Sequence, residues 1–137
     1  RFAGGDSNRI AHQTALHVVK QPGNLTPLFV HGPTGCGKTH LLEGVWRTAR
    51  QTAPHRRTIY LSAEQFTTQF VEALRGSGLP SFRKKYRDVE LLLIDDLQFF
   101  AGKPSTLTEL QHTVDTLMRG GRQIVFAADR GLPERSG

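Results

Sequence analysis

A glycine-rich run from Gly32 to Thr39 has the residue types and spacing needed to hold a phosphate group. It reads Gly-Pro-Thr-Gly-Cys-Gly-Lys-Thr, which matches the phosphate-loop pattern, and it follows a short apolar segment at 28–31. Glycines let backbone N–H groups turn inward around a β-phosphate, and the helix expected after the loop adds partial positive charge. Lys38 would reach the β- and γ-phosphates, while the Thr39 hydroxyl would bind Mg²⁺. The run therefore predicts a site for ATP or ADP with Mg²⁺.

Two acids end a second apolar run, from Leu91 to Asp96. An apolar strand within a sheet would fix Asp95 near the metal ion, and Asp96 would polarise the attacking water as a candidate base. Two acids at a solvated strand end are the alternative, which the phosphate loop disfavours. Asp129 follows the apolar run 123–128, where its side chain would sense the γ-phosphate or orient water. We expect Asp96 and Asp129, with the loop lysine, to carry any hydrolysis.

Short apolar runs alternate with amphipathic stretches, and this alternation would place both motifs at strand ends. We expect strands at 28–31, 58–61, 91–95 and 123–128, helices at 8–20 and 38–51, and further helices opening at the capping boxes Ser62/Gln65 and Thr106/Glu109. The expected apolar faces of the last two helices are Phe66, Phe70, Ala73 and Leu74, and Leu107, Leu110, Val114 and Leu117. The pattern predicts an α/β fold with a doubly wound parallel sheet, whose ligands bind at the carboxyl ends of the strands.

Composition sets broad limits on the protein. The chain has 137 residues, enough for one domain, with 37% hydrophobic residues, 14 glycines and 7 prolines. No run approaches the length of a membrane span and no leader pattern is present, so we expect a cytoplasmic protein. The single cysteine, Cys36, is interpreted as a small side chain in a tolerant loop position, with a redox switch as the alternative. A net charge of +6 favours a phosphate-bearing partner, although a piece of a larger protein need not be balanced by itself.

Several runs together resemble the DnaA family of bacterial replication initiators, within the AAA+ class. They are Gly5 to Ala11, Pro27 to Gly32, Gly37 to Leu42, Ile94 to Phe100 and Ala128 to Arg130. The resemblance covers nearly all of the chain, and its most specific part is Asp95 to Phe100. It implies a three-layer, RecA-like P-loop NTPase core over residues 1–137. It also implies an ATP-switched initiator that assembles on the replication origin, opens the duplex, holds single-stranded DNA and helps bring in the replicative helicase.

The resemblance also implies roles for individual residues. The implied nucleotide-binding residues are Asn8, Gly32, Thr34, Gly35, Cys36, Gly37, Lys38, Thr39 and His40. Asn8 would contact the adenosine, with a helix N-cap as the alternative. Val71 and Lys103 match positions that bind single-stranded DNA, although Ser105 stands where relatives often carry a basic residue. A basic cluster at 83–87 around Tyr86 suits a surface that tracks a nucleic-acid backbone, or a solvated helix face.

The same resemblance implies parts of the family that this sequence does not contain. They are a helical lid, an arginine finger and a helix-turn-helix domain that reads duplex origin DNA, so we expect weak nucleotide binding and slow hydrolysis. Contact of a longer protein with membrane lipid stays open. The alternatives are an AAA+ helicase loader, a P-loop kinase acting on a small molecule, and a binding module whose acid pair does not support hydrolysis.

Overall fold

The computed structural model describes residues 17–21, 23, 26–31 and 38–128. Most of the helix expected at 8–20 lies outside these residues, and its last part, 17–20, is helical as expected. The described elements alternate between strands and helices along the chain, as the pattern of apolar runs predicts.

Four parallel strands form one sheet in the order β1-β4-β3-β2. They are β1 (Leu28–His31), β2 (Thr58–Ser62), β3 (Leu91–Asp95) and β4 (Gln123–Ala128). All residues of β3 and β4 are buried, which agrees with their continuous apolar runs and with a position between two layers of helices. The predicted parallel α/β sheet is therefore confirmed.

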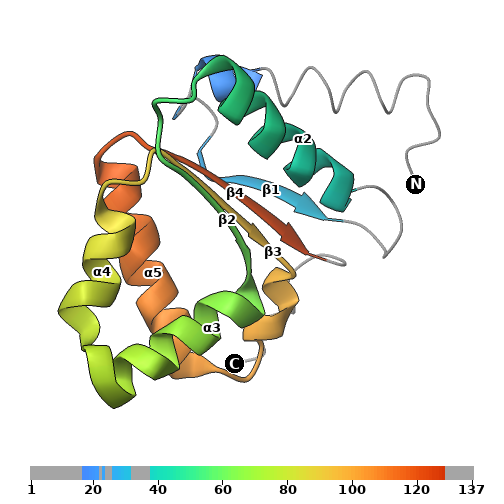
Figure 1. Cartoon of the computed structure of the whole chain (residues 1–137). Helices are drawn as coiled ribbons and strands as arrows, with labels where there is room; N and C mark the ends of the chain where they lie inside the picture. The colour runs from blue at the N-terminus through green and yellow to red at the C-terminus, as the bar shows by residue number, and fades with distance from the viewer. Residues whose placement is uncertain (1–16, 22, 24–25, 32–37, 129–137) are drawn as a thin grey trace.

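Helices cover both faces of the sheet and make three layers (Figure 1). One face packs against α2 (Lys38–Thr52) and the helical residues 17–20, through side chains that include Leu93 and Val125. The other face packs against α3 (Ala63–Glu72), α4 (Leu79–Arg87) and α5 (Pro104–Arg119). Successive residues of β3 alternate between the two cores, because side chains along a strand point to opposite faces.

The helix after β2 begins as the sequence predicts. The Ser62 hydroxyl accepts a hydrogen bond from the Gln65 backbone N–H at 3.0 Å, and the Gln65 side chain accepts one from the Ser62 N–H at 2.8 Å. Phe66, Phe70 and Ala73 are buried, but Leu74 is 58% exposed, so its assignment to the apolar face is wrong. The chain widens into a π-helical turn, η1 (Ala73–Ser77), and this turn rotates Leu74 away from the core.

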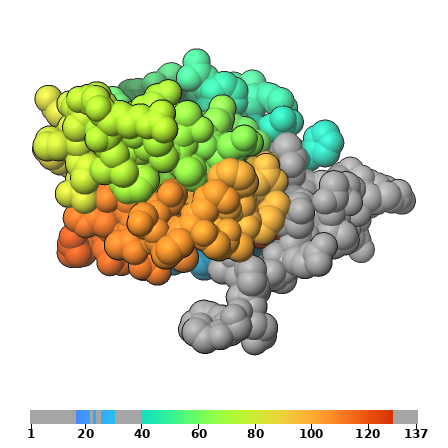
Figure 2. Space-filling view, turned by 90° about the horizontal axis from the view of Figure 1, so that it is seen from below, coloured from blue at the N-terminus to red at the C-terminus, as the bar shows by residue number. Residues whose placement is uncertain are grey.

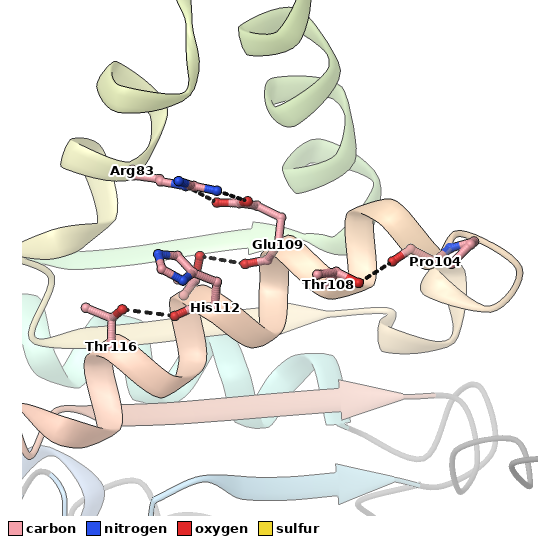
Figure 3. A network of polar contacts seen from close by, with 7 residues as sticks. Arg83, Pro104, Thr108, Glu109, His112 and Thr116 are labelled. Atoms are coloured by element: carbon pink, nitrogen blue, oxygen red, sulfur yellow. Dashed lines mark hydrogen bonds and ion pairs between the residues drawn. The ribbon is translucent and has the colours of Figure 1, made fainter.

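The start predicted for α5 is wrong by three residues. The helix begins at Pro104 instead of after Thr106, because proline fits the first helical position and needs no N–H partner there. Thr106 is buried inside the helix, and Glu109 accepts hydrogen bonds from Arg83 on α4 in place of closing a capping box (Figure 3). Leu107, expected in the core, is 38% exposed as a consequence of this register.

Candidate functional site

The carboxyl ends of the strands meet at one edge of the sheet, and the two sequence motifs converge there. β3 ends at Asp95, which is paired with Ser62 at the end of β2. β1 ends at His31, level with Ala128 at the end of β4. The first turn of α2, which starts at Lys38, lies at the same edge (Figure 1). Parallel α/β folds bind their ligands at this edge, as expected from the sequence.

The acid pair has two different environments. Asp95 is 8% exposed at the end of the buried strand, and its Oδ1 accepts a hydrogen bond from the Asp96 backbone N–H at 2.8 Å. Asp96 adopts a left-handed conformation with φ of 59°, which aspartate tolerates better than most residues, and its side chain is exposed. Its carbonyl oxygen accepts from the Phe99 N–H at 2.9 Å and starts the 3₁₀ turn η2 (Leu97–Phe100). The turn thus separates a fixed, buried carboxylate from an adjacent solvent-facing one.

The pKa of Tyr60 shows that this edge of the sheet is negatively charged. Burial, and to a smaller extent the negative charges of Asp95, Glu43 and Asp96 in that order, together raise the pKa of the Tyr60 phenol to about 12. The fields of three carboxylates therefore overlap near one side chain, on β2 next to the acid-bearing strand. Tyr60 and Glu43 were missed in the sequence because each lies within an ordinary strand or helix pattern, with no motif around it.

The residues of the phosphate loop are described only in part. Asn8, Gly32, Thr34, Gly35, Cys36, Gly37 and Asp129 lie outside the described residues. Lys38 and Thr39 are the first two residues of α2, and only their place in the helix is described. His40 is exposed on the same turn. The N-terminus of α2 directs unpaired N–H groups and a partial positive charge toward the edge that bears Asp95.

Asp95 and the start of α2 fit a magnesium ion whose other ligands are phosphate oxygens. Mg²⁺ prefers oxygen ligands and is usually held by one or two carboxylates together with phosphate oxygens and water. Asp95 supplies such a carboxylate at the end of a buried strand. Glu43 and Asp96 add negative charge nearby, as the raised pKa of Tyr60 indicates. Within residues 17–21, 23, 26–31 and 38–128, no group of three or more His, Cys, Asp or Glu side chains could hold a metal ion by itself.

The two residues matched to DNA contact lie on the face of the sheet that is covered by α3, α4 and α5. Val71 is partly exposed near the end of α3, and the exposed Leu74 lies less than one turn further along. Lys103 precedes α5, where its ammonium lies 3.9 Å from the centre of the Phe99 ring and donates to the Phe99 carbonyl oxygen at 3.1 Å. Figure 2 shows α3 and α5 side by side on this surface. Ser105, in the first turn of α5, is exposed.

None of the helices among the described residues is both long and apolar enough to span a membrane.

The parallel sheet has helices on both faces and the acid pair Asp95-Asp96 at the end of β3. Together with the Gly32–Thr39 sequence, this arrangement defines a P-loop NTPase fold of the AAA+ class. The family model described as the bacterial DnaA ATPase domain matches residues 1–135. The chain belongs to this family.

Individual relatives agree with the family assignment. The chain is 45% identical over 131 residues to the chromosomal replication initiator protein DnaA of Synechococcus sp. (strain JA-2-3B'a(2-13)), which covers 95% of this chain and 28% of the relative. It is 44% identical over 136 residues to the DnaA of Microcystis aeruginosa, covering 98% of this chain and 30% of the relative. The chain thus spans about three tenths of the length of these curated relatives.

Solved structures give the same result. Domain III of the Thermotoga maritima DnaA has a TM-score of 0.87 and 43% identity, over 94% of this chain and 54% of that one. A replication initiator DnaA bound to AMPPCP and single-stranded DNA has a TM-score of 0.86 and 36% identity, over 98% of this chain and 44% of that one. The structure of DnaI shares the fold at a TM-score of 0.72 with 19% identity, over 93% of this chain and 68% of that one.

Proposed function

We propose that this chain is the ATP-binding and slowly hydrolysing core of a replication initiator that acts on DNA in the cytoplasm. The observation that carries the proposal is the meeting of Asp95, Asp96 and the start of α2 at one edge of the sheet. The family assignment and a relative that binds both AMPPCP and single-stranded DNA support it. Self-assembly on the origin and delivery of the replicative helicase belong to the same proposal.

The two carboxylates of the acid pair would have different roles in the nucleotide site. Asp95 is held in place at the strand end and would bind Mg²⁺ together with the Thr39 hydroxyl. Asp96 faces solvent and would polarise the attacking water, and Asp129 would sense the γ-phosphate. Because aspartate is one methylene shorter than the glutamate that many AAA+ proteins carry at the base position, we expect slow, switch-like hydrolysis.

Matched substitutions separate the two carboxylates. Asp95→Asn should weaken the Mg²⁺-dependent part of ATP binding, measured by titration with a fluorescent ATP analogue with and without the metal. Asp96→Asn should leave that binding nearly unchanged and reduce ATP hydrolysis by about 10²-fold or more, as expected when a general base is lost. Asp115→Asn, an exposed change on α5, is the control and should alter neither quantity. Equal loss of binding in both variants would contradict the division of roles.

The DNA half of the proposal rests on the surface around Val71 and Lys103. Val71 and Leu74 together expose apolar area at the end of α3, which suits contact with bases or sugars. The Lys103 ammonium has three N–H donors, and the bond to Phe99 occupies one of them, so it can meet a phosphate while it is held in place. Both α3 and α5 contact η2, the turn that follows Asp96, so the DNA surface and the acid pair are joined through one short segment.

Binding of a labelled oligothymidine in the presence of an ATP analogue tests this half. Val71→Asp and Lys103→Ala should each weaken binding. Lys20→Ala, which removes an exposed lysine on the opposite face of the sheet, is the matched control for the second change. If ATP and DNA sites communicate, DNA must strengthen nucleotide binding by the same factor as nucleotide strengthens DNA binding. Unchanged oligothymidine affinity in both variants would remove this surface from the proposal.

A further inference from the structure

A groove between α4 and α5 lies apart from the nucleotide edge and from the surface around Val71 and Lys103. Its volume is about 190 Å³, room for a phosphate group with several waters. The lining residues are Arg83, Tyr86, Arg87, His112, Thr113 and Thr116. None of these six residues carries a carboxylate, and three of them carry nitrogen donors.

Helical spacing brings the nitrogen donors together from both helices. Arg83 and Arg87 are one turn apart on α4, and His112 and Thr116 are one turn apart on α5, so each pair shares a helix face. The side chains of Arg87 and His112 are exposed. Tyr86 is buried beneath them, and its hydroxyl donates to the Gln69 side-chain oxygen at 2.7 Å, away from any ligand in the groove.

A bidentate ion pair fixes one wall of the groove. Arg83 donates from Nε to Glu109 Oε2 and from a terminal nitrogen to Oε1, both at 2.8 Å, and Figure 3 shows the two planar groups facing each other. Glu109 is 5% exposed, whereas the Arg83 side chain is 42% exposed. A guanidinium has five N–H donors, so three of them point elsewhere after the pair has formed. The charge of Arg83 neutralises the buried carboxylate of Glu109. Because none of the lining residues carries a carboxylate, nothing in the lining offsets the charge of Arg87.

The threonine hydroxyls do not add donors. Thr113 donates to the Glu109 carbonyl oxygen at 3.1 Å, and Thr116 donates to the His112 carbonyl oxygen at 3.0 Å. Donors available to a ligand therefore come from the two arginines and the histidine ring. Guanidinium groups match phosphate oxygens in geometry and are the usual choice for that anion.

We propose that the groove between α4 and α5 binds the phosphate backbone of a DNA strand, with a phosphate seated between Arg87 and His112. This inference rests on the DNA half of the proposed function and adds a second contact track to it. Lys84 and Lys85 lie on other faces of α4 and are also exposed, so they add to the positive field around the helix, which favours phosphates. An acidic peptide fits less well, because the lining offers one aromatic residue and no aliphatic residue for its side chains.

Backbone amide NMR of the 137-residue chain, titrated with a short oligothymidine, locates the contact. We expect shifts at His112, Thr113 and Thr116. The double substitution Arg87→Gln with His112→Gln should lower DNA affinity roughly 5- to 10-fold and reduce the slope of log affinity against log salt by about 0.7. Arg47→Gln removes one exposed cation from α2, on the opposite face of the sheet, and should change affinity less than about 2-fold.

Three results would overturn the groove assignment, and they are distinguishable. Shifts confined to the surroundings of Val71 and Lys103, with unchanged affinity in the double variant, would reject the groove and leave the other DNA surface standing. Stronger groove shifts with polyglutamate than with oligothymidine at equal charge would assign the groove to an acidic protein segment. Absence of any DNA binding, with the ATP analogue bound, would reject both the groove and the DNA half of the proposed function.

Discussion

Phe66 lies in the core between the sheet and helices α3, α4 and α5. It has no exposed surface, and its ring centre lies 5.4 Å from that of Phe82, 5.6 Å from Tyr86 and 5.9 Å from Phe100. These partners belong to α4 and η2, so one ring joins α3 to both. Because η2 follows Asp96 directly, the same ring supports the turn that presents the acid pair.

Replacing Phe66 by alanine should lower the free energy of unfolding by about 4 kcal/mol. Truncation of a buried phenylalanine costs roughly 3–5 kcal/mol, including the cavity left behind. Edge-to-face aromatic pairs add about 0.5–1.5 kcal/mol each to burial, and Phe66 makes such contacts with Phe82 and Phe100. A loss of this size is a large part of the roughly 5–15 kcal/mol that stabilises a typical domain.

Urea unfolding followed by circular dichroism measures this change. Phe29→Ala is the matched control, because Phe29 is 49% exposed on β1 and makes one close ring contact, 5.1 Å to Phe126. We expect the control to lose about 1 kcal/mol. A loss of less than about 1.5 kcal/mol for Phe66→Ala, or a loss no larger than that of the control, would refute the reasoning from burial.

Four further substitutions, which make three predictions, test other parts of the structure by the same unfolding measurement. Ser62→Ala should cost about 1 kcal/mol, because the Gln65 N–H loses its capping acceptor, and an unchanged value would show that the cap is not formed in solution. Burial and the nearby carboxylates raise the pKa of Tyr60 from 10.0 to about 12, so the folded state keeps a proton that the unfolded chain releases. Stability therefore falls as pH rises between these values. The full shift corresponds to about 2.7 kcal/mol, and partial exposure of the side chain reduces this to about 1 kcal/mol. On going to pH 12, the Tyr60→Phe variant should therefore lose about 1 kcal/mol less stability than the unaltered chain. Equal losses in the two proteins would contradict the pKa shift. Gly23→Ala should destabilise the protein by about 2 kcal/mol or more, because φ is +90° and a Cβ would lie 2.3 Å from the Gly121 oxygen. Gly44→Ala, in the middle of α2 where a Cβ meets nothing, should stabilise it by about 0.5–1 kcal/mol. Changes of the same sign in the free energy of unfolding of both variants would contradict this contrast.

The strands and the edge of the site could be predicted because their signals are local. Leu91 to Ile94 form a continuous apolar run that is typical of a strand covered on both faces, and the strand carries Asp95 to the carboxyl edge. The start of α2 followed from the glycine-rich loop in the same way. Both features depend on residue order within a few positions, which a sequence displays directly.

The errors and omissions concern contacts between distant segments. Glu109 has the spacing of a capping box, but Arg83, 26 residues earlier, takes its carboxylate. Leu74 has the spacing of the apolar face of α3, but a π-helical turn changes the period at that point. Nothing in the sequence around Tyr60 indicates that Asp95, Glu43 and Asp96 raise its pKa. The groove between α4 and α5 was suggested only as a basic cluster, because nothing local specifies which residues of α5 face it.

The central claim is that ATP binds at the start of α2, and titration with a fluorescent ATP analogue and Mg²⁺ tests it most directly. Lys38→Ala should weaken binding at least about 10-fold, since the phosphates lose their principal cation. Lys84→Ala removes an exposed lysine from the other face of the sheet and should bind as the unaltered chain does. Unlabelled ATP should displace the analogue. Equal affinity of the Lys38→Ala variant and the unaltered chain would contradict the account.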